Sequence, residues 1–430
     1  RARFRDLLLS EAAGVIMLEP ADSQQAYDFT GAALAISERF EQPVMLRMTT
    51  RVCHSKSIVV PHPLPQPAGS PDFKRDIPSR VMIPAYARPA HRRLRDKLAK
   101  AADYAETCAQ TLLESRGASL GIIASGVAAM HAREVAPEAS LLQLGFSYPL
   151  PMQAIRQFVA SVERCVVLEE GDPILLTELR AAGLAVEGKP ERFRFGELNA
   201  DRVRRILDHD VSAEPVVPPG KPPALCEGCS HRPVFETLKR LDCIVSGDIG
   251  CYTLGVLPPF PAMDTCVCMG ASIGVGLGLR HVLPPEQARR VVSVIGDSTF
   301  VHSGLTGLAE MVYNPPPTGH LLMILDTGTT AMTGQQEHPG TGRSLQHEPA
   351  NRLLFEDVAR AMGIQYVVTL DPMAQGNALE EAIIEALASG QLAVIVARRP
   401  CILAAPKIRQ YEKIALERTG QCATSCAASE

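Results

Sequence analysis

The sequence predicts a multi-domain α/β protein built on parallel sheets. Short apolar segments typical of strands alternate along the chain with helical segments, and several of these strands end in polar, glycine-containing turns. Of the 430 residues, 46% are hydrophobic and 21% are charged, which is typical of a folded protein with a sizeable core. The length suits two or three domains of ordinary size.

The composition argues against several classes of partner. The formal net charge is −4 and no long run carries one sign, so we expect no nucleic-acid binding. The sequence contains no stretch of about 18 apolar residues, which argues against a membrane span. It opens without a signal-peptide pattern, so we expect a cytoplasmic location. Twelve cysteines in a reducing compartment favour metal, cluster or catalytic roles over disulfides.

Proline-rich segments divide the sequence into three units. The first unit, residues 1–62, contains a strand, a helix and a strand: Gly14–Leu18, Asp22 or Ser23 to about Phe40, and Pro43–Thr49. The second unit, residues 81–212, contains a helix and three strands that suit a small parallel sheet: His91–Ser115, Ser119–Ala124, Ser140–Leu144 and Cys165–Leu168. Residues 63–80 and 213–224 are predicted linkers, 225–412 form the third unit, and 413–430 are a short tail.

Acidic residues follow the last strand of the second unit. Glu169, Glu170 and Asp172 come directly after Leu168. We interpret them as a solvated turn at the end of a strand and not as a ligand site.

Two strands of the third unit end in turns that contain aspartate. Val291–Ile295 is followed by Gly296-Asp297-Ser298, and Leu321–Leu325 is followed by Asp326-Thr327-Gly328-Thr329. Open parallel sheets bind ligands at their carboxyl edge, so oxygens from Asp297 and Thr327 can meet on one cation. Mg²⁺ prefers oxygen ligands and often shares them with a phosphate, so we predict a Mg²⁺-diphosphate site. Taken singly, Asp297 could be a helix N-cap and Thr327 a turn residue.

Four cysteines are expected near this edge. Cys226 and Cys229 form a C-x-x-C pair, Cys251 follows a strand predicted at Leu241–Val245, and Cys401 follows a strand predicted at Ala393–Val396. Two ligands from a C-x-x-C and two distant single cysteines supply the four thiolates of a 4Fe–4S cluster. A zinc ribbon would need a second C-x-x-C. A structural pair of thiols remains the alternative, and we place Cys243 inside its strand.

A helix rich in glycine follows Cys268. Gly270, Gly274 and Gly278 recur every four residues and therefore share one helical face. Such a face permits close packing against another backbone, or the approach of a flat ligand. The spacing does not match a dinucleotide fingerprint after a clear strand.

Taken together, these motifs resemble the thiamine diphosphate-dependent 2-oxoacid:ferredoxin oxidoreductases, in particular the large subunits that act on indolepyruvate. The resemblance rests on six segments: Cys-Glu-Gly-Cys-Ser-His-Arg at 226–232, Gly-Asp-Ile-Gly-Cys-Tyr at 247–252, Cys-Met-Gly-Ala-Ser-Ile-Gly at 268–274, Gly-Asp-Ser-Thr-Phe-Val-His-Ser-Gly at 296–304, Thr-Thr-Ala-Met-Thr-Gly at 329–334 and His-Pro-Gly-Thr-Gly at 338–342. It implies a thiamine diphosphate-binding fold for 225–412 and a smaller transketolase C-terminal-like α/β domain for 81–212.

The resemblance also implies roles for single residues. Asp297, the Thr327 side chain and the Thr329 carbonyl would bind Mg²⁺, and Cys226, Cys229, Cys251 and Cys401 would bind the cluster. His231, His302 and His338 would lie near the cofactor as catalytic candidates, although capping or packing roles remain open for each. Further cofactor contacts are implied at Gly250, Met269, Gly270, Gly296, Ser298, Thr299, Thr330, Met332 and Thr333.

The activity implied by the resemblance is oxidative decarboxylation of an aryl 2-oxoacid. The cluster would take electrons singly and pass them to ferredoxin, and coenzyme A would capture the acyl group. The implied partner is a smaller beta (gamma-type) subunit in a hetero-oligomer. Other possibilities are the same chemistry on pyruvate or another 2-oxoacid, a non-redox thiamine enzyme, and a non-catalytic cofactor-binding or assembly subunit.

The sequence departs from the family at both ends. Members carry a complete pyrimidine-binding domain with a catalytic glutamate, and residues 1–62 match only its last part, so we expect that glutamate to be absent. Cys422 and Cys426 match the last two cysteines of a ferredoxin-like run, whose first two positions are Leu416 and Thr419 here. We therefore expect a chain truncated at both ends and incomplete as an enzyme on its own.

Overall fold

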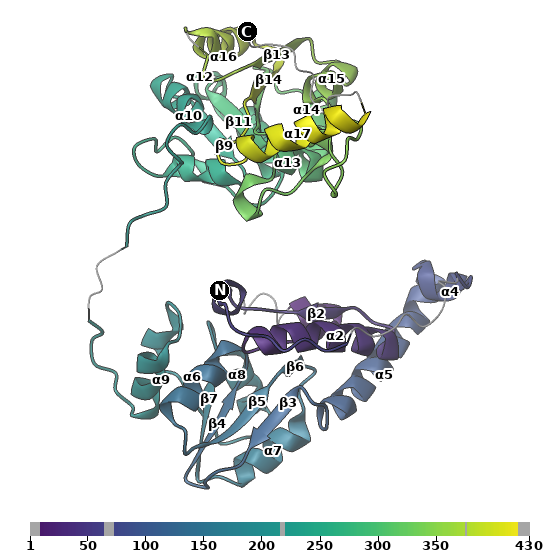
Figure 1. Cartoon of the computed structure of the whole chain (residues 1–430), viewed down its shortest axis with the longest axis vertical. Coiled ribbons are helices and arrows are strands. Elements are labelled where there is room, and N and C mark those ends of the chain that lie inside the picture. Colours follow the sequence, from purple (N-terminus) through teal and green to yellow (C-terminus); the bar gives the residue numbers. More distant parts are fainter. Residues whose placement is uncertain (1–8, 64–72, 216–219, 375, 420–430) are drawn as a thin grey trace. The chain divides into compact units, whose positions relative to one another are not determined.

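The computed structural model describes residues 9–63, 73–215, 220–374 and 376–419 (Figure 1). The chain divides into two compact units, which we call unit 1 (Arg1–Val216) and unit 2 (Val217–Glu430). Cys422 and Cys426 lie outside the described residues. Within the described part of the chain, no helix has both the length and the apolar character needed to cross a membrane.

Unit 2 is built on one six-stranded sheet of order β10-β9-β11-β12-β14-β13, in which every neighbouring pair of strands is parallel. The strands are β9 (Ile244–Gly247), β10 (Thr265–Cys266), β11 (Val291–Gly296), β12 (His320–Asp326), β13 (Tyr366–Leu370) and β14 (Leu392–Arg398). The central strands β11 and β12 are buried along their whole length, which explains their largely apolar sequences.

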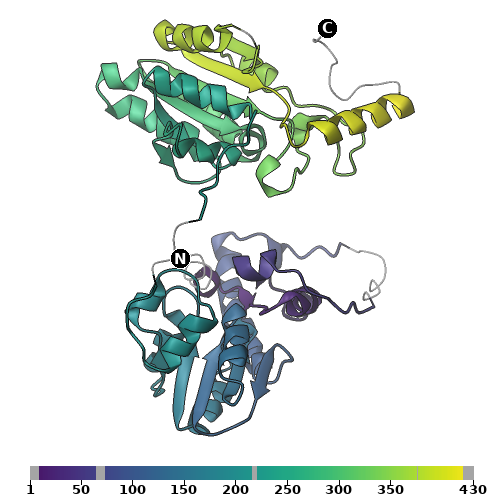
Figure 2. The ribbon, with the colours of Figure 1, turned by 60° about the vertical axis from the view of Figure 1, so that its left-hand side comes forward.

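Helices cover both faces of this sheet (Figures 1 and 2). On one face, α10 (His231–Arg240) and α16 (Ala378–Ser389) contribute Leu238 and Ile383 to the core. On the other, α11 (Ala271–Val282), α14 (Leu305–Tyr313) and α15 (Phe355–Ala361) contribute Ile273, Leu308 and Phe355. The remaining helical segments are η2 (Cys251–Val256), α12 (Pro285–Ala288), α13 (Asp297–Thr299), η3 (Phe300–Gly304), η4 (Ala331–Thr333), η5 (Pro339–Thr341) and α17 (Ala405–Thr419).

Unit 1 contains two sheets. A three-stranded sheet has the order β2-β1-β6, and a five-stranded sheet has the order β3-β5-β4-β7-β8. The strands are β1 (Ile16–Leu18), β2 (Val44–Leu46), β3 (Thr111–Glu114), β4 (Leu120–Ala124), β5 (Ser140–Leu144), β6 (Phe146–Tyr148), β7 (Arg164–Leu168) and β8 (Glu187–Gly188). Because β6 pairs with β1, a shared sheet joins residues of the predicted first and second units.

The helical segments of unit 1 are α2 (Ser23–Phe40), α3 (Thr50–His54), α4 (Ile77–Arg80), α5 (Pro84–Ala105), α6 (Val127–Val135), α7 (Met152–Ala160), α8 (Ile174–Ala181), η1 (Glu191–Arg194) and α9 (Ala200–Leu207). The helix predicted at His91–Ser115 was wrong at both ends. It begins earlier, at Pro84, and Thr111–Glu114 leave it to form the antiparallel edge strand β3 beside β5. The short apolar pair Leu112 and Leu113 is compatible with a helix and with a strand, so the sequence alone did not distinguish the two.

Three further expectations are corrected. The strand predicted at Leu241–Val245 is β9, which begins three residues later, at Ile244. The delay arises because Asp242, just after α10, adopts a left-handed conformation (φ 53°). Cys243 therefore precedes the strand and is half-buried. Glu169 is no solvated turn residue, since it is 1% exposed and its two carboxylate oxygens accept from the amides of Leu175 and Leu176, both at 3.0 Å.

The glycine helix packs differently from the prediction. Side chains at Gly274 and Gly278 would meet open space, so the expected close-packed face is wrong. Close approach occurs instead at Gly276, where an added Cβ would collide with Ser293 of β11, and at Gly270 (φ 86°), where it would collide with Ser303.

Candidate functional site

The candidate site lies where β11 and β12 end. Asp297 follows β11 and is 4% exposed. Its Oδ1 accepts from the Ser298 amide at 2.8 Å, and its Oδ2 accepts from the amides of Thr327 and Gly328 at 2.8 and 2.9 Å. The turn after β12 thus folds around the carboxylate of Asp297, as expected when neighbouring parallel strands end at one edge.

Three oxygens gather at this turn. The Thr327 hydroxyl lies 3.3 Å from Asp297 Oδ2 and 3.2 Å from the Thr329 carbonyl oxygen. Adjacent ligands of an octahedral Mg²⁺ with bonds of about 2.1 Å lie about 3 Å apart. The spacing of the Thr327 hydroxyl from each of the other two oxygens therefore fits one such cation. These are the three oxygens that the family resemblance implies as ligands.

The surroundings of Asp297 favour its charged form. Burial by itself would raise the pKa of this carboxyl, but the contact with His338 and the amides of Ser298 and Thr327 outweigh it and hold the pKa below its usual range. His338 Nε2 lies 3.4 Å from Asp297 Oδ2. A carboxylate kept ionised in a buried site is suited to bind a cation.

A cavity of about 100 Å³ adjoins these turns. The predicted site residues that line it are His231, Gly250, Cys251, Met269, Gly296, Asp297, Ser298, Thr299, Thr327, Thr329, Thr330, Met332 and Thr333. The other predicted residues lie outside this lining: Cys226, Cys229, Gly270, His302, His338 and Cys401. Sequence reasoning did not select four lining residues, Ile249, Tyr252, Leu325 and Ala331.

Tyr252 is the largest of these missed residues. It is 4% exposed, and its hydroxyl donates to the Ile249 carbonyl at 2.9 Å. Its ring occupies the space that side chains at Gly250 and Gly296 would need. The signal was present in Gly250-Cys251-Tyr252, where glycines accompany an aromatic residue, but Gly296 comes from a distant segment.

His231 is buried beside Tyr252. Its ring lies edge-on to the tyrosine ring, with 5.9 Å between centroids. Burial lowers the pKa of His231 to about 4, so it is neutral at physiological pH. His302, in contrast, is exposed, and its Nδ1 lies 3.1 Å from the Ser303 hydroxyl. Of these two histidines, only His231 faces the cavity.

Asp248 is a positioning residue that the sequence did not reveal. It is fully buried at the end of β9, and its Oδ1 accepts from the Gly270 amide at 2.9 Å while its Oδ2 accepts from the Ser272 amide at 3.0 Å. These bonds tie the turn that carries Cys251 to the start of α11. Met269, which lines the cavity, directly precedes the bonded Gly270.

The predicted cluster ligands are linked to the same edge. The Cys401 amide donates to the Thr327 carbonyl at 2.9 Å, which fastens the loop after β14 to the turn after β12. The Arg232 guanidinium donates to the Cys226 carbonyl at 2.8 Å and so supports the C-x-x-C loop. An added Cβ at Gly228 would meet Ile402 at 3.0 Å, so this loop lies against the residue after Cys401.

The four thiols lie within electrostatic reach of one another. The pKa of Cys229 is raised by burial, with Cys226 and Cys401 adding to the effect. The pKa of Cys251 is raised by burial and by the other three thiols. Within the described ranges, no group of three or more histidine, cysteine or acidic side chains is arranged to hold a single metal ion. A four-iron cluster is larger than one ion and holds its thiolates farther apart.

Comparison with known proteins identifies the domain that holds this site. Residues 248–397 match the family model described as thiamine pyrophosphate enzyme, C-terminal TPP binding domain. This range contains the turns after β11 and β12 and the cavity-lining residues from Ile249 onward. Unit 2 therefore carries a thiamine diphosphate-binding domain, and the predicted α/β fold class is confirmed.

Curated relatives match nearly the whole chain. The indolepyruvate oxidoreductase subunit IorA of Archaeoglobus fulgidus is 32% identical over 97% of this chain and 70% of its own length. That of Methanothermobacter marburgensis is 35% identical over 92% of this chain and 68% of its own length. A solved 2-oxoglutarate:ferredoxin oxidoreductase from Magnetococcus marinus aligns with 42% of this chain and 65% of its own, at 16% identity and a TM-score of 0.35.

The chain spans about two thirds of the length of these curated relatives. Their identity and coverage, together with the thiamine diphosphate-binding domain, show a subunit of a thiamine diphosphate-dependent oxidoreductase. The predicted resemblance is thereby confirmed, and the chain belongs to the family of indolepyruvate oxidoreductase subunit IorA.

Proposed function

We propose that this subunit takes part in the coenzyme A-dependent oxidative decarboxylation of aryl 2-oxoacids such as indolepyruvate, with electrons passing through a 4Fe–4S cluster to ferredoxin. One observation carries the proposal. The three candidate cation ligands follow β11 and β12. Cys251 follows β9 and Cys401 follows β14 in the same sheet, and the loop with Cys226 and Cys229 lies against Ile402, next to Cys401. The Cys401 amide even donates to the Thr327 carbonyl, at 2.9 Å.

The chain's residues divide the work of holding the cofactor. Asp297, Thr327 and Thr329 would bind Mg²⁺ through their oxygens. The Ser298 hydroxyl could donate to the diphosphate, while the hydroxyls of Thr299, Thr330 and Thr333, which line the same cavity, would first have to leave the acceptors they now donate to. Bound thiamine diphosphate supplies a ring that accepts electron density when carbon dioxide leaves.

Other lining residues shape the cavity around that ring. Ile249, Met269, Leu325 and Met332 are apolar lining residues and would pack against the ring. The neutral His231 can donate or accept a hydrogen bond there without bringing a charge. His231 is therefore the histidine that we propose as catalytic. His338 would act on Asp297, and exposed His302 is the weakest of the three candidates.

The cysteines would serve electron removal. Because the pKa values of Cys229 and Cys251 are raised, both are protonated thiols at neutral pH, and binding of iron would release their protons. Non-redox thiamine chemistry does not need four thiolates close to the turn after β12, which contains Thr327. The proposal therefore favours electron transfer, with a smaller beta (gamma-type) subunit and ferredoxin as partners in a cytoplasmic hetero-oligomer.

Iron analysis tests the cluster. Anaerobic reconstitution with iron and sulfide should give about four irons per chain. Cys401→Ser should lower this content and change the electron paramagnetic resonance signal of the reduced protein. Cys53→Ser, an exposed cysteine of unit 1, is the matched control and should retain full iron content. A wild-type chain without iron would reject the cluster.

Turnover tests the substrate class. The subunit should be assayed with its partner subunit, coenzyme A and a viologen dye on indolepyruvate, phenylpyruvate, pyruvate and 2-oxoglutarate. We expect the aryl substrates to have the highest kcat/KM. A preference for pyruvate would assign the same chemistry to another 2-oxoacid. Cofactor binding without any turnover would instead favour a non-catalytic subunit.

A further inference from the structure

A second cavity of unit 2 lies beside the helix α17. It has a volume of about 310 Å³ and is lined by residues within 334–347, by residues within 404–411 and by Thr329. We call it the α17 pocket. Of the lining residues that the structure describes, only Thr329 also lines the cavity beside Asp297, so the two cavities are distinct. The volume falls at the lower end of the range of small-molecule pockets, about 300–1,000 Å³.

The pocket lining contains a buried carboxylate with an unused oxygen. The Glu337 side chain is 5% exposed, and its Oε1 lies 2.9 Å from Arg343 Nε and 2.9 Å from His347 Nδ1. Its Oε2 is buried and has no hydrogen-bond partner among the described residues. The nearby Thr341 hydroxyl donates to the His338 carbonyl instead, at 2.9 Å. Because a buried polar atom without a partner costs free energy, a ligand that donates to Oε2 is favoured here.

A second buried acceptor belongs to the same lining. The side-chain oxygen of Gln335 is buried and has no hydrogen-bond partner in the described part of the chain. Gln335 and His347, which both line the pocket, hold positive φ angles of 65° and 63°. Residues other than glycine rarely adopt this conformation, and it clusters at ligand sites. The pocket thus offers two acceptors to a group with several N–H donors, such as an ammonium, which has three.

The helix α17 supplies a positive charge and an apolar wall. Lys407 lines the pocket and is exposed, so its ammonium can meet a negative group at the pocket rim. Ile408 is 8% exposed, and the Tyr411 ring stacks on the His347 imidazole with 4.1 Å between centroids and 8° between planes. Leu345, on the opposite segment, is exposed and adds apolar surface that a ligand can cover. The pocket therefore suits a ligand with a negative group and an apolar body besides its N–H donors.

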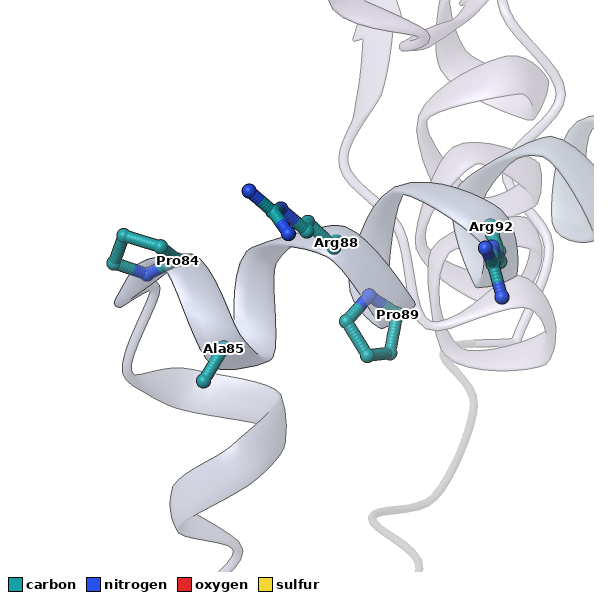
Figure 3. A pocket seen from close by; sticks show the side chains of 5 residues that line it. All are labelled: Pro84, Ala85, Arg88, Pro89 and Arg92. Atoms are coloured by element: carbon teal, nitrogen blue, oxygen red, sulfur yellow. The ribbon is translucent and has the colours of Figure 1, made fainter.

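Burial distinguishes this pocket from a larger depression in unit 1. That depression, of about 380 Å³, lies on the first turns of α5 and is lined by Pro84, Ala85, Arg88, Pro89 and Arg92 (Figure 3). All five residues are exposed, and none of them holds a buried polar atom without a partner. The depression therefore gives no sign of a missing ligand, whereas the α17 pocket holds two unsatisfied acceptors.

We propose that the α17 pocket binds a free α-amino acid with a large apolar side chain. The ammonium of the ligand donates to Glu337 Oε2 and to the side-chain oxygen of Gln335. Its carboxylate pairs with Lys407, and its side chain lies against the wall of Ile408 and Tyr411. An amine alone would leave Lys407 unpaired, and a carboxylic acid alone would leave Glu337 Oε2 without a donor. An α-amino acid satisfies all three parts of the pocket at once.

Isothermal titration calorimetry of the full chain tests the site, with thiamine diphosphate and Mg²⁺ present in excess. L-Phenylalanine and L-leucine should each bind once per chain, with a Kd of about 1 mM or below. Phenethylamine lacks the carboxylate and 3-phenylpropionate lacks the ammonium. Each should bind about tenfold more weakly than L-phenylalanine, because each loses a charged hydrogen bond. The measurement needs no turnover, so its result is independent of the proposed enzymatic function.

Two variants locate the site. Lys407→Met should raise the Kd of L-phenylalanine about tenfold and leave that of phenethylamine unchanged, because phenethylamine has no carboxylate to lose. Lys413→Met removes an exposed lysine of the same helix outside the pocket and should change neither Kd. Glu337→Gln should weaken L-phenylalanine about tenfold or more while the circular dichroism spectrum stays as in the wild type.

Four results would overturn the proposal. The first is no saturable binding of either amino acid up to about 10 mM. The second is equal affinity for phenethylamine and L-phenylalanine, which would show a site for amines. The third is an equal effect of Lys407→Met and Lys413→Met. The fourth is binding of L-phenylalanine that disappears when thiamine diphosphate and Mg²⁺ are added, which would place the amino acid in the cavity beside Asp297.

Discussion

Both units place a buried carboxylate directly after a parallel strand, yet the two carboxylates differ in use. Glu169 follows β7 in unit 1, and its two oxygens accept from the first amides of α8. Asp297 follows β11 in unit 2, where the Thr327 hydroxyl lies beside its Oδ2 and the Thr329 carbonyl oxygen lies beside that hydroxyl. Strand-end position and burial do not distinguish these residues. The distinguishing feature is a surplus of oxygens beside a cavity.

The groups that balance the negative charge of the two carboxylates also differ. In unit 1, the buried Lys189 donates to the Glu169 carbonyl at 2.6 Å and brings a positive charge next to the strand end. In unit 2, the partner of Asp297 is His338, at 3.4 Å. We infer that the chain itself completes the environment of Glu169, while the environment of Asp297 is completed by a bound cation.

Removal of the Asp297 carboxylate should have the largest effect. Asp297→Ala should weaken thiamine diphosphate binding in Mg²⁺ by about 100-fold or more, because a first ligand is lost and ligand-supporting residues alone are worth 10- to 100-fold. Isothermal titration calorimetry gives the affinity. A change below about threefold would contradict the assignment of Asp297 to the metal.

Glu169→Gln should lower stability and leave thiamine diphosphate affinity nearly unchanged. The free energy of unfolding should fall by about 1–3 kcal/mol, because the neutral amide is a weaker acceptor for the α8 amides and presents one oxygen where there were two. Thiamine diphosphate affinity should stay within about twofold of the wild type. Urea unfolding and calorimetry on one preparation separate the two properties. A strong loss of affinity with intact stability would show that the two strand ends are functionally alike.

A buried histidine at the opposite end of the sheet in unit 2 should respond to pH. Burial of His320 lowers its pKa to about 3, below the ordinary 6.5, so the folded state holds it neutral. The unfolded state takes up the proton first, and the stabilisation present above pH 6.5 is lost as the pH falls toward 3. Between pH 7 and pH 5 the loss is about 2 kcal/mol.

Urea unfolding at these two pH values measures this loss. His320→Gln should show a smaller loss by about that amount, while its affinity for thiamine diphosphate at pH 7 is retained. An unchanged pH dependence in the variant would show that His320 is not the responsible group.

Thr327 should give the smallest effect. Thr327→Val preserves the shape of the side chain but removes its oxygen, so thiamine diphosphate binding in Mg²⁺ should weaken by about tenfold. Thr327→Asn again offers an oxygen and should restore most of the affinity. If valine and asparagine behave alike, the side chain of Thr327 is not a ligand.

The sequence predicted those features that depend on neighbours along the chain. Strand β5 was predicted with its observed bounds, and the turns at Asp297 and Thr327 follow their strands as expected. Each of these segments combines an apolar run with polar turn residues, and its local pattern has one plausible interpretation. The α/β class followed from the same alternation.

Features that depend on distant segments were missed. The ring of Tyr252 fills space left by Gly296, and Asp248 binds amides more than twenty residues away, at Gly270 and Ser272. Strand β3 exists because β5 pairs with it, and the isolated sequence also suited a helix. The burial of Glu169 depends on α8 folding back over its strand end. No local pattern encodes these contacts.

The metal dependence of cofactor binding tests the central claim most directly. Thiamine diphosphate affinity should be measured for the wild type and for Asp297→Ala, each in Mg²⁺ and each in excess chelator. We predict that the chelator weakens binding strongly in the wild type and leaves the already weak binding of Asp297→Ala unchanged. Wild-type affinity that ignores the chelator, or a variant that keeps the full metal dependence, would contradict a Mg²⁺-diphosphate site at the carboxyl ends of β11 and β12.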